Sequence, residues 1–226
     1  MKKGKLIIIE SGTDGSGKAT QTQRLYDKLI VQGKKVRKIT FPNYDSPACM
    51  PVKMYLNGEF GSNPGDVNAY VASTFYAIDR FASFKSDWGE FYNNGGIILS
   101  DRYTTSNMVH QAVKMDNRFE RDRYLNWLYE IEFELYGLPK PDCVVFLNLS
   151  PIISQKLMAD RANKFTGDKQ KDIHECNHEY LKKCYDNSLE IANKYSWKMV
   201  KCNEGEELKS IEDISDEVYE IVKEYV

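Results

Sequence analysis

The sequence predicts an α/β fold in which a parallel β-sheet is covered by helices on both faces. Short runs of consecutive apolar residues recur along the chain, and strands without polar alternation are typical of a sheet that is buried on both sides. Longer amphipathic stretches separate these runs, and parallel strands need such crossover connections. The chain has 226 residues without an internal repeat or a linker-like segment, so we expect a single domain over residues 1–226.

Five segments have the composition of buried strands. The first is Leu6–Ile9, whose apolar residues are followed at once by Glu10. Such runs predict the strands of one parallel sheet, flanked by helices. The other expected strands are Val36–Phe41, Gly96–Ser100, Asp142–Leu147 and Trp197–Cys202.

Three amphipathic helices are expected from apolar residues that recur at helical spacing. In a helix over residues 17–31, Leu25 and Leu29 share one face, and Gly33 ends the helix. A longer helix over residues 66–84 begins at an Asp-type cap, and a third helix lies near the end of the chain. The residues expected to face inward are Val67, Val71, Phe75 and Ile78 in the longer helix, and Leu208, Ile211, Val218 and Ile221 in the last one.

The overall charge and the cysteines exclude several classes of protein. The 31 basic and 33 acidic residues give a formal net charge of -2, which argues against a protein that mainly grips nucleic acid. No apolar stretch is long enough to cross a bilayer, and the run after the basic start is too short for an export signal. The five cysteines lack CxxC spacing and fit free thiols in a reducing compartment. We therefore expect a cytoplasmic protein without nucleic-acid or membrane partners.

A phosphate-binding loop follows the first expected strand directly. Residues 12–20 contain the spacing Gly-x4-Gly-Lys, which is the phosphate-loop signature. The glycines let backbone N–H groups point at phosphate oxygens, the next helix adds the positive end of its dipole, and Lys18 can reach the outer phosphates. This motif predicts the P-loop NTPase fold and a nucleotide site. The expected nucleotide-binding residues are Gly12, Thr13, Asp14, Gly15, Ser16, Gly17, Lys18, Ala19 and Thr20.

The residue after the loop lysine departs from the usual motif. A Ser or Thr hydroxyl normally binds Mg²⁺ at this position, but the chain has Ala19. Thr20 is adjacent, yet on a helix its side chain points in another direction. Magnesium binding is therefore expected to depend on Asp101 and on water.

Asp101 and Arg102 provide a second functional signal. They stand at the end of the expected strand Gly96–Ser100, where open α/β sheets place residues that contact ligands. In this position Asp101 can face Mg²⁺ or its waters, and Arg102 can face a phosphoryl group during transfer. The alternative is an ordinary surface ion pair.

Over nearly its full length, the chain resembles the thymidylate kinases among the P-loop nucleoside monophosphate kinases. The matching segments are the loop, Phe41-Pro42, Tyr76-x3-Arg80, DRYTTSNMVHQ over residues 101–111 and GLPKPDCVVFL over residues 137–147. The resemblance implies a five-stranded parallel sheet, a homodimer, and transfer of the ATP γ-phosphoryl group to dTMP with Mg²⁺.

The resemblance also assigns roles to single residues. Asp14 matches the family's contact to the sugar 3′-hydroxyl and to nearby catalytic groups. Tyr76 stands where an aromatic residue stacks on thymine, although a helical tyrosine can also simply be part of the core. Arg80, one helical turn later, matches a contact to the base, and Arg102 matches a contact to the acceptor phosphate.

Further acceptor positions follow from the same segments. Asn107 matches a position that touches the base. His110 stands where an aromatic residue helps to exclude a ribose 2′-hydroxyl, and Gln111 follows it in the same motif. Phe41 and Pro42 match the segment that approaches the acceptor phosphate.

Residues 161–172 correspond to the family's lid over the bound nucleotides. Gly15 occupies the place where some members carry a loop arginine, so the chain resembles the members whose lid supplies the arginine. Arg161 is then the expected catalytic arginine that neutralises charge during transfer. Weaker candidates are Lys164, Lys169 and Lys171, which also fit a solvated charged loop.

Departures from the family pattern leave a second hypothesis open. Residues 43–45 are Asn, Tyr and Asp, where the family usually has an arginine for the acceptor phosphate. His110 and Ala19 are further departures. The alternative is a nucleotide-binding protein with weak turnover, with another pyrimidine nucleotide as acceptor, or with a sensor role.

A competing motif lies at residues 174–178. His174-Glu175-Cys176-Asn177-His178 matches the His-Glu-x-x-His pattern of zinc proteases, in which Glu175 would act as the base. No histidine follows that could be a third ligand, and Asp172 with Glu175 also matches the acidic pair that closes the kinase lid. This context argues against a zinc protease.

Overall fold

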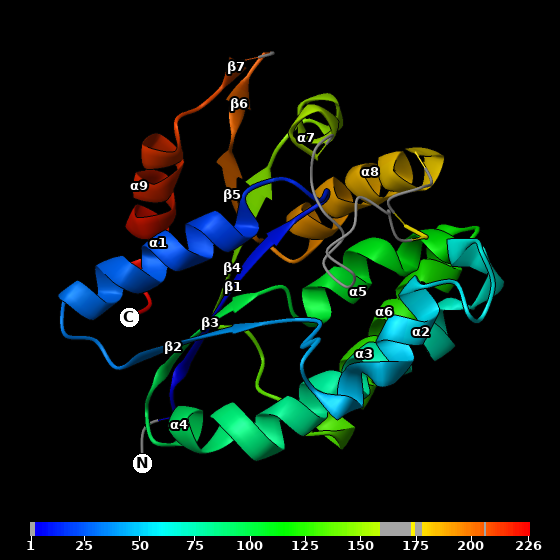
Figure 1. Cartoon of the computed structure of the whole chain (residues 1–226), viewed down its shortest axis with the longest axis horizontal. Helices are drawn as coiled ribbons and strands as arrows, with labels where there is room; N and C mark the ends of the chain where they lie inside the picture. The colour runs from blue at the N-terminus through cyan, green and yellow to red at the C-terminus, as the bar shows by residue number, and fades with distance from the viewer. Residues whose placement is uncertain (1–2, 159–172, 175–177, 206) are drawn as a thin grey trace.

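The fold is a twisted parallel sheet between two layers of helices (Figure 1). The structure is a computed structural model of the 226-residue chain and describes residues 3–158, 173–174, 178–205 and 207–226. The five-stranded sheet has the order β2-β3-β1-β4-β5, and each neighbouring pair of strands is parallel. The predicted fold class and its five strands are therefore confirmed. The strands are β1 (Lys5–Ser11), β2 (Val36–Thr40), β3 (Ile97–Asp101), β4 (Cys143–Asn148) and β5 (Lys198–Lys201), with β6 (Asn203–Glu204) and β7 (Glu207–Leu208) forming a short antiparallel pair.

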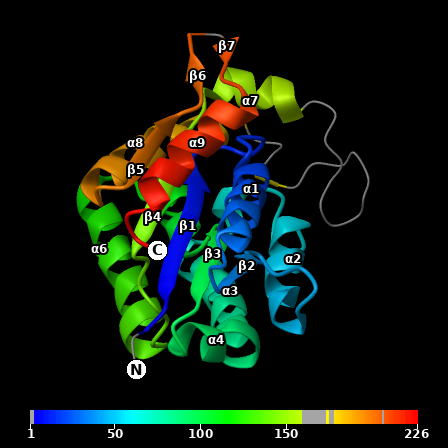
Figure 2. The same cartoon turned by 90° about the vertical axis from the view of Figure 1, so that its left-hand side faces the viewer.

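The two faces of the sheet build two separate hydrophobic clusters. Alternate residues of a strand point to opposite faces, so neighbouring apolar residues such as Ile8 and Ile9 enter different clusters. One cluster packs under α1 and α9, and Figure 2 looks onto this face. The other packs against Trp88 and Tyr92, in and beside α4. This two-sided burial explains why the strands lack polar alternation.

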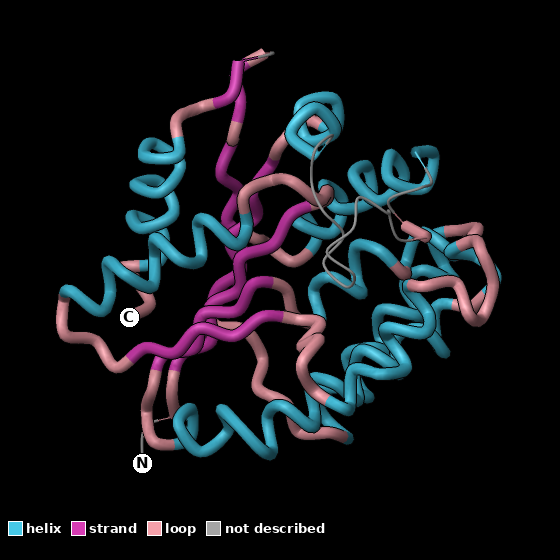
Figure 3. Tube along the Cα trace, viewed as in Figure 1, coloured by secondary structure: helices cyan, strands magenta, loops and turns pink. Residues whose placement is uncertain are grey.

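Helices fill the connections between the strands, as Figure 3 shows along the backbone trace. Among the described residues, no helix is both long and apolar enough to span a membrane. The helices are α1 (Lys18–Val31), α2 (Met50–Leu56), α3 (Ala69–Ser83), α4 (Gly89–Asn93), α5 (Thr104–His110), α6 (Arg118–Tyr129), α7 (Pro151–Met158), α8 (His178–Lys194) and α9 (Ile211–Val222).

The helix predicted over residues 66–84 forms, but it begins later and buries another face. Asn68 caps α3, because its side chain accepts the N–H of Val71 at 2.9 Å. Val71 and Ile78 are each 43% exposed, so the prediction that they face inward is wrong. The buried face is instead small and polar, because this helix carries Asp79 and Arg80 into the interior.

The two remaining helix predictions hold for most of their residues. Leu25 and Leu29 of α1 are buried, and Gly33 follows the helix with a positive φ of 73°. In α9, Val218 is buried, but Ile211 is 47% exposed at the first turn. Leu208 lies in β7 and not in the helix, because the chain makes a short hairpin before α9 begins.

Candidate active site

The phosphate loop lies between β1 and α1, at the carboxyl ends of the strands. Gly17 is the N-cap of α1 with φ 84° and provides no side-chain cap, and the first turn of the helix contains no acidic residue. The first N–H groups of α1 are therefore available to an anion such as a phosphate. Gly12 allows α8 to approach the loop closely, because a Cβ there would lie 2.2 Å from Oγ of Ser188.

Lys18 is buried beneath the loop and is only 6% exposed. Its Nζ donates to Oγ of Ser11 at 2.7 Å and to the carbonyl oxygen of Thr13 at 3.0 Å, and it lies 3.8 Å from Oδ1 of Asp14. Burial and the positive charge of Arg102 lower the pKa of Lys18 to about 8, against the opposing effect of three nearby carboxylates. A phosphate would restore the preference for the charged amine.

Arg102 connects the loop with the end of β3. Its Nη2 forms an ion pair with the carboxylate of Asp14, and its Nη1 donates to Nε2 of His110 at 3.2 Å and lies 4.0 Å from Oε1 of Glu10. Burial opposes the charge, but Asp14, Glu10 and Asp101 outweigh it and raise the pKa of Arg102. The guanidinium is therefore charged and shared among several partners.

The backbone of Arg102 is strained. Its φ of 68° lies in the left-handed region, which residues with a Cβ rarely adopt and which concentrates at functional sites. The N–H of Arg102 donates to the carbonyl oxygen of Ile9 at 3.2 Å, so the strained turn is anchored to β1. The sharp turn ends β3 and lets the side chain reach the phosphate loop.

Arg80 forms a second arginine–carboxylate pair, in the interior. Arg80 is 1% exposed and Glu132 is 0% exposed, and two bonds of 2.7 and 2.5 Å join the guanidinium to the two carboxylate oxygens. Further donors of Arg80 reach the carbonyl oxygen of Tyr103 at 3.4 Å and Oδ1 of Asn107 at 3.3 Å. The hydroxyl of Thr104 donates to Glu132 at 2.6 Å, so this network ties α3 to α5.

Comparison with known proteins agrees with this geometry. The family model for thymidylate kinase matches residues 9–214. A thymidylate kinase from Mycobacterium tuberculosis is 30% identical over 163 residues, which are 72% of this chain and 74% of that protein. The human thymidylate kinase is 26% identical over 218 residues, 96% of this chain and 89% of that protein. The chain belongs to the thymidylate kinase family.

A solved thymidylate kinase structure supports the same assignment. The enzyme from Candida albicans, whose structure reveals the origin of broad substrate specificity, has a TM-score of 0.71 and 25% identity to this chain. The similarity covers 98% of this chain and 92% of that enzyme. The predicted family, the P-loop NTPase fold and the prediction of a phosphotransferase are therefore confirmed.

Among the acceptor residues expected of a thymidylate kinase, Asn107 and Gln111 lie on or directly after α5. Both are almost fully buried, at 3% and 1% exposure. Within the described part of the chain, Nδ2 of Asn107 and Oε1 of Gln111 have no hydrogen-bond partner. One amide thus offers a donor and the other an acceptor.

His110 is held in one tautomer by Arg102. Because Nη1 of Arg102 donates to Nε2, the proton of a neutral His110 is on Nδ1, which has no partner among the described residues. Burial, helped by the charge of Arg102, lowers the pKa of His110 well below its ordinary value. The ring is therefore neutral.

The remaining predicted acceptor residues lie around the end of β2 and on α3. Phe41 is 3% exposed and packs in the core, with its ring centroid 6.0 Å from that of Tyr103, while Pro42 is half-buried beside it. Tyr76 is half-buried, and its ring meets Tyr55 edge-on at 6.5 Å. Tyr76 therefore lies at the boundary between a small core cluster and the surface.

The sequence analysis missed Glu10 as a site residue. Glu10 is fully buried at the end of β1 and accepts the hydroxyls of Thr105 at 2.7 Å and Ser106 at 2.6 Å. It thereby fixes α5 against the strand and places a negative charge near Arg102. A signal was present, because an acid that ends an apolar strand directly before a phosphate loop needs a partner.

Asp79 was missed as well. Its Oδ2 accepts the N–H of Asn43 at 2.8 Å, which fixes the segment after β2, and its Oδ1 has no partner among the described residues. Burial raises the pKa of Asp79 to about 6, although the bond from Asn43 and the charge of Arg80 act in the opposite direction. Val67 and Phe75 do contact a core cluster, as predicted, but Val71 and Ile78 do not face inward, so the place of Asp79 on the buried face of α3 could not be foreseen.

The residues at the loop fit a magnesium ion held largely by phosphate and water. Asp101 is 9% exposed, and its Oδ1 has no partner in the part of the chain that the structure describes. A carboxylate oxygen is a ligand that Mg²⁺ prefers. Ala19 offers no oxygen, Thr20 is exposed, and the described residues contain no cluster of three metal-ligating side chains. Asp101 is thus the residue suited to Mg²⁺.

Two predictions concern residues outside the described ranges. Arg161 and the lid over residues 161–172 lie there, as do residues 175–177 of the zinc-protease motif. His174 is described, and its Nε2 lies 2.9 Å from the hydroxyl of Tyr55, while its ring stacks on His110 at 6.4 Å. Burial, with the nearby charge of Lys114, lowers the pKa of His174 to about 3. Because the chain belongs to a kinase family, the His-Glu-x-x-His pattern at residues 174–178 is not favoured as a zinc-protease site.

Proposed function

We propose that this chain transfers the γ-phosphoryl group of ATP to dTMP and releases ADP and dTDP, with residues 1–226 acting as one domain. The observation that carries the proposal is the grouping of Lys18, Asp14 and Arg102. Lys18 lies 3.8 Å from Asp14, which is paired with Arg102, so one cation from the phosphate loop and one from the end of β3 share an acid. Two cations so arranged suit two phosphate groups that face each other.

The reaction needs positioning and charge stabilisation more than acid–base catalysis. An oxygen of the acceptor phosphate attacks the γ-phosphorus of ATP, a new P–O bond forms, and the bond to the β-phosphate oxygen breaks. The acceptor phosphate is already ionised at neutral pH, so no strong base is required. Lys18 stabilises charge on the donor phosphates, and Arg102 stabilises charge on the group in transfer.

The acceptor base is proposed to lie against α3 and α5. Tyr76 supplies an aromatic face. The Nδ2 donor of Asn107 and the Oε1 acceptor of Gln111, which have no partner among the residues described, suit the carbonyl and N–H groups of a pyrimidine edge. Arg80 fixes Asn107 through its 3.3 Å bond. Asp14 is proposed to meet the sugar 3′-hydroxyl, and His110 to face the sugar.

Magnesium and the lid complete the proposed machinery. Asp101 would hold Mg²⁺ directly or through water, and the ion would neutralise charge on the β- and γ-phosphates. Arg161 is proposed to add a further positive charge from the lid, and closure of residues 161–172 would exclude water from the transfer.

The proposal is tested by ADP formation with a panel of acceptors. We expect acceptor-dependent ADP with dTMP, and less with dUMP, dCMP and dGMP. The Lys18→Ala variant should lose this activity and keep its circular dichroism spectrum. Lys28→Ala is the matched control, because Lys28 lies in the same helix but pairs with Asp216 on the surface. Retained activity in the Lys18 variant would contradict the site.

The second candidate is a nucleotide-binding protein with weak or altered acceptor turnover. It is suggested by Ala19 and by the absence of an arginine in residues 43–45. ATP binding without acceptor-dependent ADP would favour this candidate, whereas turnover of several pyrimidine acceptors would resemble the broad specificity described for the C. albicans enzyme.

A homodimer and a cytoplasmic location belong to the same proposal. Three apolar residues of α3 are exposed, namely Val71 at 43%, Ile78 at 43% and Phe81 at 36%. A second copy of the chain could cover this apolar surface. The four cysteines within the described ranges, Cys49, Cys143, Cys184 and Cys202, are free and buried, which fits a reducing compartment. Analytical ultracentrifugation tests the dimer. The wild type is expected to sediment as a dimer and the Ile78→Arg variant as a monomer.

A further inference from the structure

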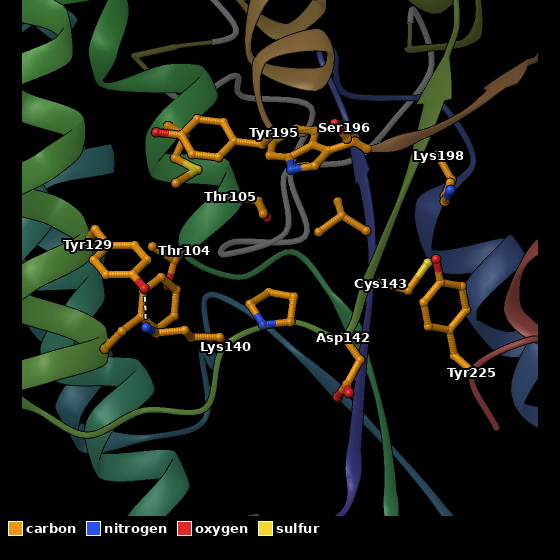
Figure 4. Close-up of a pocket in the computed structure, with 15 residues that line it drawn as sticks. Thr104, Thr105, Tyr129, Lys140, Asp142, Cys143, Tyr195, Ser196, Lys198 and Tyr225 are labelled. Carbon is orange, nitrogen blue, oxygen red and sulfur yellow. Dashed lines mark hydrogen bonds between the residues drawn. The ribbon is translucent and has the colours of Figure 1, made fainter.

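A cavity lies behind α5, and none of the residues predicted to contact nucleotide lines it. Its volume is about 220 Å³, and its walls come from β4, α5, the end of α6 and the segment between α8 and β5. Figure 4 shows Tyr129 and Tyr195 on one side of this cavity and Cys143 and Tyr225 on the other. The cavity is a concave site separate from the phosphate loop, on a helix that the nucleotide site also uses.

The walls of the cavity favour a flat apolar ligand. Five aromatic residues line it together with Met108, Val144 and Pro141, and aromatic faces pack best against planar rings. The volume lies below the roughly 300–1,000 Å³ of sites for drug-sized molecules, so it suits one or two fused rings. The aromatic residues are Tyr129, Phe133, Tyr195, Trp197 and Tyr225.

The charges at the edge of the cavity favour an anionic group on that ligand. Lys140 and Lys198 both line it, and neither has a carboxylate partner within ion-pair distance among the described residues. Lys140 bonds instead to the hydroxyl oxygen of Tyr129. The one acid of the lining, Asp142, already pairs with Lys5 at 2.7 Å. Two uncompensated cations therefore remain for a ligand.

Two residues of the lining connect the cavity to both site arginines. Thr104 donates to Glu132 at 2.6 Å, and Glu132 holds Arg80. Thr105 donates to Glu10 at 2.7 Å, and Glu10 lies 4.0 Å from Arg102. A molecule in the cavity would thus contact the first turn of α5, whose hydroxyls orient the carboxylates behind the acceptor site.

We propose that this cavity is an effector site for a small planar aromatic carboxylate, and that its occupation tightens binding of the nucleotide acceptor. The cavity and the two arginine clusters coexist in one conformation, so a ligand that binds this conformation also stabilises the arrangement of Arg80 and Arg102. The expected effect on acceptor affinity rests on the proposed kinase function. Binding of the carboxylate in the cavity does not depend on that function.

Binding is tested first, without nucleotides, by isothermal titration calorimetry on the full chain. The probe is 2-naphthoate, and the neutral 2-naphthamide is its charge control. We expect the carboxylate to bind about tenfold more tightly than the amide, and the variant with both Lys140→Gln and Lys198→Gln to lose this difference. Lys201→Gln is the matched control, because Lys201 is exposed on the same strand but does not line the cavity.

The coupling is tested by acceptor affinity with and without saturating 2-naphthoate. We expect the KM for dTMP to fall about fivefold with kcat unchanged in the wild type and in Lys201→Gln, but not in the double variant. If the chain has no turnover, calorimetric titration of dTMP gives the same comparison, so a failure of the proposed function is distinguished from a failure of the effector site. No binding, binding that the double variant retains in full, displacement of the probe by dTMP or ATP, or an unchanged affinity for dTMP would each overturn the proposal.

Discussion

The molecule contains two buried arginine–carboxylate clusters that differ in how their charges are satisfied. Arg80 meets one carboxylate, Glu132, through two short bonds, and both side chains are almost completely buried. Arg102 is 13% exposed and is surrounded by three acids, with φ of 68° in its backbone. Breaking the Arg80–Glu132 pair would leave a buried charge without a partner. Arg102, in contrast, can turn toward a phosphate while its acids keep other partners.

This difference assigns different roles to the two arginines. If Arg102 moves, Glu10 still accepts hydrogen bonds from the hydroxyls of Thr105 and Ser106. Asp14 still has its ion pair with Lys18. Nothing comparable is available to Glu132, whose only other side-chain donor among the described residues is Thr104. We therefore propose that Arg80 maintains the shape of the proposed acceptor site and that Arg102 stabilises charge during transfer.

The largest expected effect on stability comes from breaking the Arg80–Glu132 pair. Glu132→Ala leaves Arg80 buried without a counter-charge, so the free energy of unfolding should fall by about 3–5 kcal/mol. Urea denaturation followed by circular dichroism measures this. Glu190→Ala serves as the control, because Glu190 is 70% exposed in its pair with Arg121 and should lose under about 1 kcal/mol. Equal losses in the two variants would contradict the comparison.

Arg102→Ala should affect the rate more than the stability. Removing a charge that acts on the transferred group is expected to lower kcat by about 10²–10³-fold. Arg37→Ala, at the exposed pair with Asp87, is the control in steady-state assays. A kcat within about tenfold of the wild type would show that Arg102 is not the stabilising group.

Asp79 extends the comparison to a buried carboxylate that has no arginine within ion-pair distance in the described part of the chain. Its raised pKa of about 6 means that the folded state holds this proton more tightly than the unfolded chain. This contribution is present below the ordinary pKa and is lost as the pH rises through about 6. Relative to Asp79→Asn, the wild type should lose on the order of 2–3 kcal/mol between about pH 4 and 7, measured by denaturation at each pH. Parallel curves for the two proteins would refute the buried charge.

The smallest expected effect is the titration of Lys18. Because its pKa is lowered to about 8, the uncharged amine accumulates above that pH. kcat/KM for ATP should therefore fall by up to about tenfold per pH unit in the alkaline range, as expected for one essential proton. Lys18→Arg, which stays charged, should have lower activity but no such decline. A wild-type profile that stays level to about pH 9.5 would mean that the charge of Lys18 is not required.

The positions in the fold of the residues proposed to bind nucleotide could be predicted, because these residues are close in sequence or lie at strand ends. Residues 12–20 form one continuous loop, and Asp101 and Arg102 end the neighbouring strand, so parallel pairing of β1 with β3 brings them to one edge. The inward face of α3 was predicted wrongly, because apolar periodicity cannot show that a helix buries Asp79 and Arg80 in place of Val71 and Ile78.

The sequence by itself determined the strands, the phosphate loop and the family, because these depend on local composition and on contiguous motifs. Only the tertiary structure decided the partners of the buried charges. Glu132 lies 52 residues from Arg80 in the chain, and Thr105 lies 95 residues from Glu10. A buried ion needs a partner, but the sequence does not show which distant residue is that partner. The packing of α3, α5 and β1 determines which residues come together.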